Sequence, residues 1–439
     1  MKGMRPAIII GIIVLMAVGW YSLSEDNKKK ELEYQTTLKE ARTKAQMGIY
    51  VDANLAYDTA ISMKESKNLM CEIADYYVES NQDKLFIKAC LDIIKKYPKD
   101  EAGYRRLVEY YYYAEDFKNC YVYINQASKR QVQSETIDKV HEKIYYTYHT
   151  KRVDLEQVDI LFDRLFLVQS KDGYWGYYNE RGDQAIGCIY RKVAPFSLEE
   201  FAWVSNRNDE SYLINKNNEK KYVDVEDKNI EECSALSSGL MAAKIDGRYN
   251  YVNKNFEIVF GDFDYASAFH NEMAAIKEAE QWYFINASNE RVSEKNYKDV
   301  KLDGAQKAFR NSLAFVSDDG KGYYLTNASG QQIGENVWDD AQLFITNEPT
   351  AVKKDGKWGF VDIEGNVVVE PQYQDARPFR SGFAPVQIGE KWGYISLEEY
   401  ELVIPAIYDE VKEMSSLGNT FIREDQQWYK LSLYRYNYE

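Results

Sequence analysis

The sequence predicts a multidomain chain: a transmembrane N-terminal helix, an α-helical repeat array and an all-β repeat domain that closes into a β-propeller. Three observations predict this organisation. Residues 6–23 form an uncharged apolar run, large and small residues recur about every 34 positions before residue 150, and Trp-Gly hairpins recur every 33 to 41 residues after it. Periods of this length are typical of stacked repeats. We expect the three parts at 1–27, 28–150 and 151–439.

Composition indicates a folded, acidic chain. Aromatic residues make up 15 % of it, 38 residues are Tyr and only 8 are Pro, which is not the composition of a disordered protein. The net charge of −15 is uneven, because residues 1–150 hold 22 Lys and Arg against 21 Asp and Glu, whereas residues 151–439 hold 33 against 49. Such an acidic field repels phosphate backbones, so no nucleic-acid partner is expected.

The N-terminal segment reads PAIIIGIIVLMAVGWYSL over residues 6–23. Eighteen helical residues cover roughly 27 Å, about the hydrocarbon thickness of a bilayer. Small residues at 17–19 make a cleaved signal peptide the alternative, but the apolar run continues past them. Lys2 and Arg5 favour a cytoplasmic N-terminus, whereas Lys28–Lys30, just after the run, favour the opposite orientation. We expect a single-pass cell-membrane protein whose bulk lies outside the cytoplasm.

Residues 34–150 are rich in helix-forming residues and repeat a helix–turn–helix pattern. Its clearest copy places large, small and aromatic residues at Tyr104, Leu107, Val108, Tyr111, Phe117, Cys120, Ile124 and Ala127. These offsets resemble tetratricopeptide repeats, with units at about 34–67, 67–100 and 101–134 and a capping helix at about 135–150. An unrelated helical bundle is the alternative. The resemblance implies a concave face that docks a peptide or protein, and the candidate residues are Tyr110, Tyr111, Tyr112 and Tyr113, although core and rim roles explain them equally.

Two neighbouring segments reveal the period of the β-rich part. AVKKDGKWGFVDIEGNVVVEPQY begins at Ala351 and APVQIGEKWGYISLEEYELVIPAIY begins at Ala384. Each is a strand, a tight turn, a strand that begins Lys-Trp-Gly, a second turn and a third strand. Counting the weaker copies gives eight hairpins, whose candidate structural residues are Trp175, Gly176, Trp282, Trp358, Gly359, Trp392, Gly393 and Trp428.

These blocks resemble the WG-repeat (KWG) proteins of bacteria, and the resemblance covers about two thirds of the chain. It implies a β-repeat architecture in proteins that are often secreted or attached to the cell envelope, with no established chemistry. A buried Trp contributes a large apolar area, and a neighbouring Gly permits close backbone approach. We therefore expect the motif tryptophans in the core, with a row of exposed sugar-binding rings as the alternative.

Seven or eight hairpins suit a β-propeller, because closure removes exposed sheet edges; an open β-solenoid is the alternative. The last hairpin, over residues 420–434, lacks a third strand. We expect Val153 to Phe162 to complete it and so join the two ends of the array.

No catalytic, metal or cofactor motif appears: the sequence has no Gly-rich phosphate loop, no H-E-x-x-H and no G-x-S-x-G. The five cysteines show no C-x-x-C pair. We therefore expect a binding protein rather than an enzyme, with no cofactor: a membrane-anchored scaffold that binds a protein or peptide. The alternatives are a binder of envelope glycans or wall polymers and an enzyme with carboxylates in a propeller channel.

Overall fold

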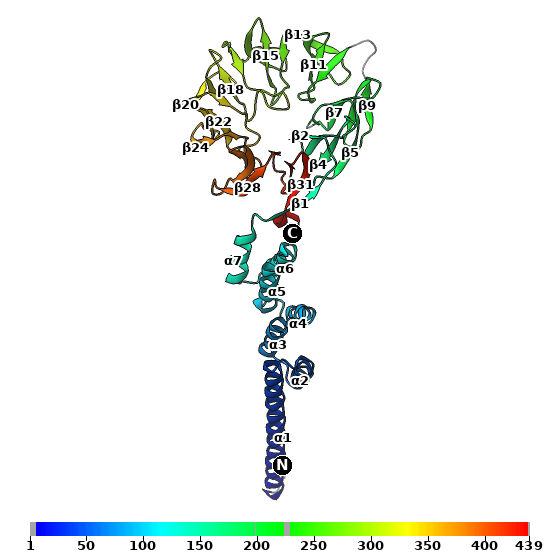
Figure 1. Cartoon of the computed structure of the whole chain (residues 1–439), viewed down its shortest axis with the longest axis vertical. Coiled ribbons are helices and arrows are strands. Elements are labelled where there is room, and N and C mark those ends of the chain that lie inside the picture. The colour runs from blue at the N-terminus through cyan, green and yellow to red at the C-terminus, as the bar shows by residue number, and fades with distance from the viewer. Residues whose placement is uncertain (1–5, 198, 224–228, 438–439) are drawn as a thin grey trace, which may run out of the picture. The chain divides into compact units, whose positions relative to one another are not determined.

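The computed structural model describes residues 6–197, 199–223 and 229–437, with side chains from residue 25 onward except at 223 and 437. These residues form two compact units, and the boundary along the chain lies between Tyr145 and Tyr146. The first is helical and the second is made of strands (Figure 1).

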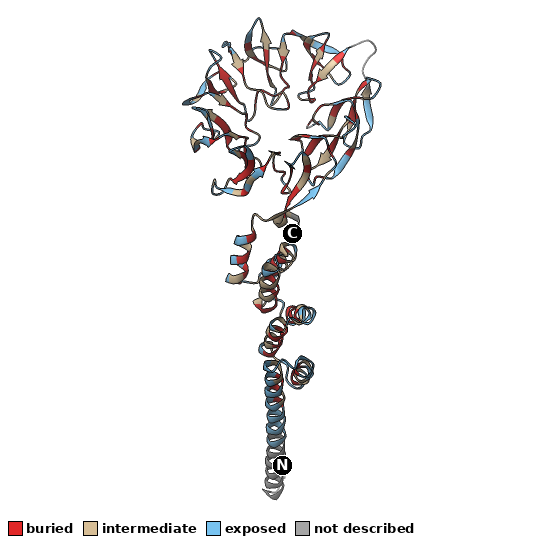
Figure 2. Cartoon of the chain, in the orientation of Figure 1, coloured by how far each residue is buried: buried red, intermediate tan, exposed pale blue. Residues whose placement is uncertain are grey.

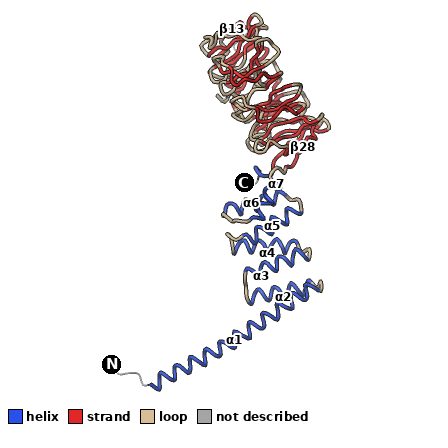
Figure 3. The backbone as a smooth tube through the Cα atoms, turned by 90° about the vertical axis from the view of Figure 1, so that its left-hand side faces the viewer, coloured by secondary structure: helices blue, strands red, loops and turns tan. Residues whose placement is uncertain are grey.

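The helical unit consists of pairs of neighbouring helices, which Figure 3 shows stacked in succession. Four of the helices begin with a side chain that accepts a hydrogen bond from a backbone N–H of the first turn. These capping residues are Ser66, Asp100, Asp116 and Ser134. The helices are α1 (Pro6–Gln46), α2 (Tyr50–Met63), α3 (Lys67–Glu79), α4 (Asp83–Lys96), α5 (Glu101–Tyr113), α6 (Phe117–Lys129) and α7 (Glu135–Ile144).

The helical array predicted from the repeat pattern is confirmed. The end of α1 pairs with α2, α3 with α4 and α5 with α6, which gives the three expected helix–turn–helix units. Small residues sit where helices approach most closely, and a Cβ added at Gly103 would come within 2.7 Å of the Ile94 side chain. The capping helix is shorter than expected, because α7 ends at Ile144 and residues 148–152 form a strand.

The predicted membrane span lies in the first half of α1, whose side chains at residues 6–24 are outside the described residues. In the part of the chain that the structure describes, no helix has the length and apolar character needed to cross a membrane. The anchor therefore stays a prediction.

The second unit is a β-propeller of eight blades, counted over the described strands. Each blade is an antiparallel meander of neighbouring strands, and Figure 1 places β2 towards the centre of the ring and β5, β9, β20 and β24 at its rim. Blades 1 to 4 are β2 (Gln157–Phe162), β3 (Leu165–Gln169), β4 (Trp175–Asn179), β5 (Gln184–Tyr190); β6 (Lys192–Val193), β7 (Phe201–Ser205), β8 (Ser211–Asn215), β9 (Lys220–Val223); β10 (Ile230–Cys233), β11 (Met241–Ile245), β12 (Arg248–Val252), β13 (Ile258–Phe263); and β14 (Tyr265–Ala266), β15 (Met273–Glu278), β16 (Gln281–Asn286).

The remaining blades repeat the pattern, and buried residues follow the middle of each blade (Figure 2). Blades 5 to 8 are β17 (Asp299–Val300), β18 (Leu313–Ser317), β19 (Tyr323–Asn327), β20 (Gln332–Trp338); β21 (Asp340–Ala341), β22 (Thr350–Lys354), β23 (Lys357–Val361), β24 (Val367–Tyr373); β25 (Asp375–Ala376), β26 (Phe383–Ile388), β27 (Lys391–Ser396), β28 (Leu402–Tyr408); and β29 (Glu410–Val411), β30 (Asn419–Glu424), β31 (Gln427–Leu433) with β1 (Tyr148–Arg152). A short helix, α8 (Tyr434–Asn437), ends the unit.

Blade 8 closes the ring by taking its outer strand from the other end of the unit. Strand β1 pairs antiparallel with β31, from Tyr148 opposite Leu433 to Arg152 opposite Tyr429. The ring confirms the propeller and excludes the solenoid. The prediction that Val153 to Phe162 completes the last blade was wrong. Most of this segment is β2 of blade 1, and its Val158 and Leu161 are buried in the cluster between blades 1 and 8. Strand β1, with the more polar sequence YHTKR, instead forms the solvent-facing edge of blade 8.

Candidate protein-binding sites

The tryptophans of the Trp-Gly pairs pack between neighbouring blades, because the buried cluster around Trp358 includes residues of blades 6 and 7 and the cluster around Trp392 includes residues of blades 7 and 8. Trp358 and Trp392 are each 7 % exposed. The strand pairing shifts by two residues beside each of them, a β-bulge that brings the next strand close. A Cβ added at Gly393 would lie 2.5 Å from the carbonyl oxygen of Ile404, and one at Gly176 would lie 2.7 Å from the backbone of Gly187. Glycine is therefore required by the close approach of the two strands.

Blade 3 meets the same requirement from the opposite strand. Its motif reads Tyr249-Asn250, with Asn where blades 1, 6 and 7 have Gly. Asn250 pairs with Gly261 on β13, and a Cβ added at Gly261 would collide with the backbone of Asn250. The missing glycine is thus replaced by one on the neighbouring strand.

Three further motif tryptophans differ in their exposure. Trp282 is 7 % exposed and Trp428 is 1 % exposed, and the indole N–H of Trp428 donates to the Glu156 carbonyl at 3.1 Å, across the closure of the ring. Trp175 of blade 1 is only partly buried. Four of the five motif tryptophans are therefore core residues by their burial, and Trp175 departs from them.

Cationic side chains cover the motif rings in several blades. Lys301 lies over Tyr323 at 4.2 Å from the ring centroid, Arg377 over Trp392 at 4.8 Å, Lys412 over Trp428 at 5.5 Å and Lys353 over Trp358 at 5.8 Å. A cation over an aromatic face is an attractive contact.

The four consecutive tyrosines of α5 point to different neighbours. Tyr110 packs against Phe86 of α4, with ring centroids 5.0 Å apart, and Tyr111 stacks on Tyr123 of α6 at 5.7 Å. Burial raises the pKa of Tyr111 to about 12. Lys143 of α7 lies over Tyr112 at 5.6 Å, and Tyr113 is 80 % exposed. Tyr110 and Tyr111 also contact each other, with ring centroids 5.2 Å apart, and so do Tyr112 and Tyr113 at 5.4 Å. That these tyrosines bind a partner stays a prediction.

The helical unit carries a groove that the sequence did not predict. This helical groove, about 600 Å³, lies between α1, α2 and α3. Arg42 holds Glu72 through two hydrogen bonds of 2.6 Å, and Arg106 holds Asp75 through bonds of 2.7 and 2.8 Å. Such bidentate pairs fix the side chains in place. The residues lining the groove include Arg42, Tyr50, Tyr57, Cys71, Glu72, Asp75, Tyr76 and Glu79.

Two cavities of the propeller are both lined by one long loop. We call residues 301–312, between β17 and β18, the channel loop; it has six residues more than the loop between β25 and β26. Asp303 braces it by accepting from the backbone N–H of Ala305 and of Lys307, both at 2.9 Å. The loop lies against blade 1, because a Cβ on Gly304 would come within 2.7 Å of Ile160.

The first of these cavities, about 480 Å³, is the Trp175 cavity. Trp175 and Trp203 provide its aromatic wall, and the channel loop closes another side. The second, about 400 Å³, shares Ile160, Gly304 and Ala305 with the first. The residues lining the Trp175 cavity also include Asp159, Leu167, Arg191, Lys192, Val193, Glu231, Glu232 and Gln306.

Charged groups of the second cavity are largely satisfied within the protein. Lys301 pairs with Asp340 at 2.7 Å and Arg310 with Asp303 at 3.0 Å. Lys307, a buried residue of the channel loop itself, lies 4.4 Å from the ring centroid of Phe162, and burial lowers its pKa to about 8. Burial and the charge of Lys307 together lower the pKa of His270 to about 4. In the part of the chain that is described, no group of three or more His, Cys, Asp or Glu could hold a metal ion.

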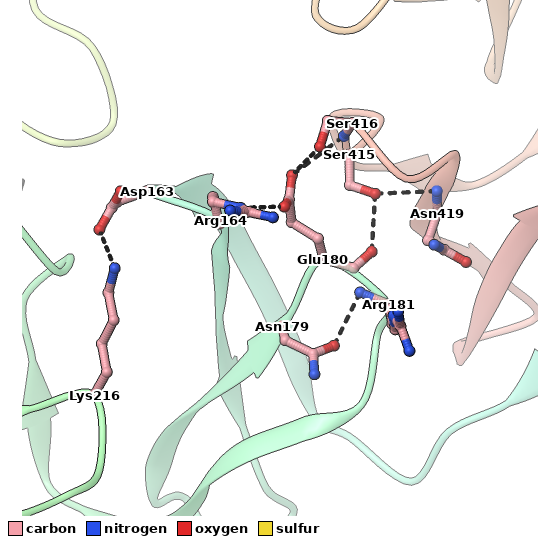
Figure 4. Close-up of polar contacts among 9 residues, drawn as sticks. All are labelled: Asp163, Arg164, Asn179, Glu180, Arg181, Lys216, Ser415, Ser416 and Asn419. Atoms are coloured by element: carbon pink, nitrogen blue, oxygen red, sulfur yellow. Dashed lines mark hydrogen bonds and ion pairs between the residues drawn. The ribbon is translucent and has the colours of Figure 1, made fainter. Parts of the chain in front are cut away.

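A buried carboxylate joins the first and last blades at the closure (Figure 4). Glu180 accepts from Arg164 at 2.6 Å and from the Ser416 hydroxyl at 2.8 Å. Ser415 donates to the backbone carbonyl of Glu180 at 2.8 Å. Burial alone would raise the pKa of the Glu180 carboxyl, but the hydrogen bonds from Arg164 and Ser416 outweigh it, and the pKa is lowered.

Comparison with known proteins agrees with the repeat architecture. The family model described as "WG containing repeat" matches residues 175–208, 251–282 and 358–392, so the chain carries WG repeats in blades of its β-propeller. No curated protein sequence matches the chain.

Three similar solved structures are each remote in sequence. BamB from Moraxella catarrhalis is 10 % identical with a TM-score of 0.41, and the alignment covers 64 % of this chain and 98 % of that one. The C-terminal WD40 domain of Sif2 is 8 % identical with a TM-score of 0.42, covering 64 % and 97 %. Kluyveromyces lactis Hsv2 is 10 % identical with a TM-score of 0.36, covering 64 % and 97 %. At these values the similarity says nothing about function.

Proposed function

We propose that this protein is a membrane-tethered interaction module that docks a segment of a partner protein in the helical groove. The observation that carries the proposal is the groove itself, which is open, about 600 Å³ in volume and lined by both tyrosines and carboxylates. Tyrosines offer apolar faces with a polar tip, a combination enriched at protein interfaces.

Ion pairs within the helical unit hold the groove ready for a ligand. Glu72 and Asp75, on successive turns of α3, are held by Arg42 of α1 and Arg106 of α5. Tyr57 of α2 donates to Glu72 at 3.2 Å. Because these side chains are already ordered before a partner binds, binding would cost little of their conformational entropy. This favours affinity.

Membrane tethering is the second element of the proposal. The apolar run at residues 6–23 supports it, together with the aromatic pair Trp20 and Tyr21 at its end. The charges before the run favour a chain whose bulk lies outside the cytoplasm.

The glycan-binding alternative relies on exposed rings. Trp282, Trp358, Trp392 and Trp428 are at most 7 % exposed and cannot stack on a sugar while the blades are folded. Among the motif tryptophans Trp175 is partly exposed, but a single ring is not the row of exposed rings that this alternative requires.

A photo-crosslinking residue in the full chain tests the proposal in native membranes. At Glu79, an exposed residue that lines the groove, it should give discrete adducts with another protein. The same residue at Lys95, exposed on α4 and outside the groove, is the matched control and should give none. Equal labelling from both positions, or none from Glu79, would contradict docking in the helical groove.

A further inference from the structure

Three blades place a cation over the motif ring from one equivalent position. Lys301, Arg377 and Lys412 each follow directly after the two-residue first strand of their blade, β17, β25 or β29. Each lies over the motif ring of its own blade, at 4.2, 4.8 and 5.5 Å. In these blades the protein itself supplies the cation that the ring attracts.

Blade 1 has the opposite charge at this position. In blade 7, Ala376 pairs with Val386, which pairs with Gly393 beside the motif Trp. In blade 1, Val158 pairs with Val168, which pairs with Gly176 beside Trp175. The register therefore aligns Asp159, one residue after Val158, with Arg377. A carboxylate replaces the cation.

The ring of Trp175 is correspondingly left uncovered. Among the described residues none places a cation over it, and it is partly exposed where the other motif tryptophans are at most 7 % exposed. It opens instead into the Trp175 cavity, of about 480 Å³, together with Asp159. The cavity thus begins where blade 1 lacks the covering cation of blades 5, 7 and 8.

The other charged groups lining the cavity already have partners. Arg191 pairs with Asp209 at 2.5 Å, and Lys192 donates to the Glu231 carbonyl at 2.7 Å. Glu231 pairs with Lys244 at 2.9 Å, and Glu232 accepts from the Tyr249 hydroxyl. Among the described residues Asp159 has no hydrogen-bond or ion-pair partner, so it is the charge left for a ligand.

We propose that the Trp175 cavity binds a lysine or arginine side chain of a partner protein, held between the ring face of Trp175 and the carboxylate of Asp159. Residues 151–439 hold 49 acidic and 33 basic residues, and the resulting negative charge would attract a basic segment. The cavity would be a second contact site between this protein and its partner. Only the statement that the bound side chain belongs to a protein rests on the proposed function.

Fluorine NMR of the full chain in detergent, labelled with 5-fluorotryptophan, tests the site. The probe is the capped peptide Gly-Ser-Arg-Ser-Gly, and its control has neutral citrulline in place of Arg. Because a cation–π contact with a carboxylate beside it is worth about 1–2 kcal/mol, the Arg peptide should bind about tenfold more tightly than its control. It should shift the Trp175 resonance, assigned through Trp175→Phe.

Charge variants complete the test. Asp159→Arg restores the cation of blades 5, 7 and 8, so it should abolish the shift while leaving the thermal midpoint unchanged or higher. Asp172→Asn, which removes an exposed carboxylate outside the cavity, should bind as wild type does. No shift with the Arg peptide, an equal shift with citrulline, or a shift that survives Asp159→Arg would overturn the proposal. These outcomes leave crosslinking at Glu79 unaffected, so the two proposals fail separately.

Discussion

Single residues explain why the WG motif recurs in a chain whose repeats have otherwise diverged. The bulge beside the motif Trp leaves no room for a side chain on one of the two strands, so blade 7 has Gly393 and blade 3 has Gly261. The Trp fills the space between neighbouring blades and is covered by a cation in blades 6, 7 and 8. Both residues of the motif are thus accounted for by packing.

Replacing Trp358 or Trp392 with Ala should lower the free energy of unfolding by about 3–5 kcal/mol, because a buried ring is lost and a cavity remains. Chemical denaturation of the full chain measures it. Trp175→Ala is the matched control and should cost less, since that ring is partly exposed. If Trp358→Ala kept wild-type stability but lost partner binding, the motif rings would be a binding surface.

The Glu180 carboxylate predicts a pH dependence. Because its pKa is lowered by folding, its contribution to stability is full above the unfolded value of about 4.3 and is lost as the pH falls through the lower, folded value. Glu180→Gln should cost about 1–3 kcal/mol at pH 7. Between pH 5 and pH 3 the variant should lose less stability than wild type. Parallel curves would show that Glu180 does not carry this dependence.

At the scale of elements, local patterns were predicted well and long-range pairings were not. The turns and alternating strands of the Lys-Trp-Gly hairpins lie within a few residues of one another, so the sequence indicated them. The closing strand was misassigned because the pairing of β1 with β31 joins residues about 280 positions apart, and the apolar segment after it was needed in the cluster between blades 1 and 8.

The candidate sites also could not be predicted from local patterns, because they depend on residues far apart in the sequence. The four tyrosines of α5 were grouped because they are consecutive, but successive helical residues point about 100° apart, so they contact three different helices. The Trp175 cavity collects residues from β2, β4, β10 and the channel loop, which no local pattern joins. One signal was present in the sequence: aligning the first strands of the repeats would have set Asp159 against Arg377 and Lys412.

The N-terminal element yields a prediction about topology. If residues 6–23 span the membrane uncleaved, protease added to intact cells should degrade the bulk of the chain and leave a short membrane-bound fragment. Opening the cells before digestion should add little. Full protection of a chain that still sediments with membranes would contradict the proposed orientation, and recovery of the intact chain in the soluble fraction would contradict the anchor.

At the scale of the whole molecule, the closed ring is the claim on which the rest depends. The Trp175 cavity is formed by blade 1 together with the channel loop of blade 5, so an open array would not form it. Closure itself rests on β1 pairing with β31 and on the contacts of Glu180 and Trp428 between the first and last blades.

A disulfide across the closure tests this claim most directly. Lys151 and Lys430 are opposite each other in the β1–β31 pair, so Cys at both positions should form an intramolecular disulfide under mild oxidation. Each single variant controls for the five native free cysteines. Only the double variant should migrate faster on a non-reducing gel, and reduction should restore its mobility. No intramolecular disulfide, or only disulfide-linked dimers, would contradict the closed propeller.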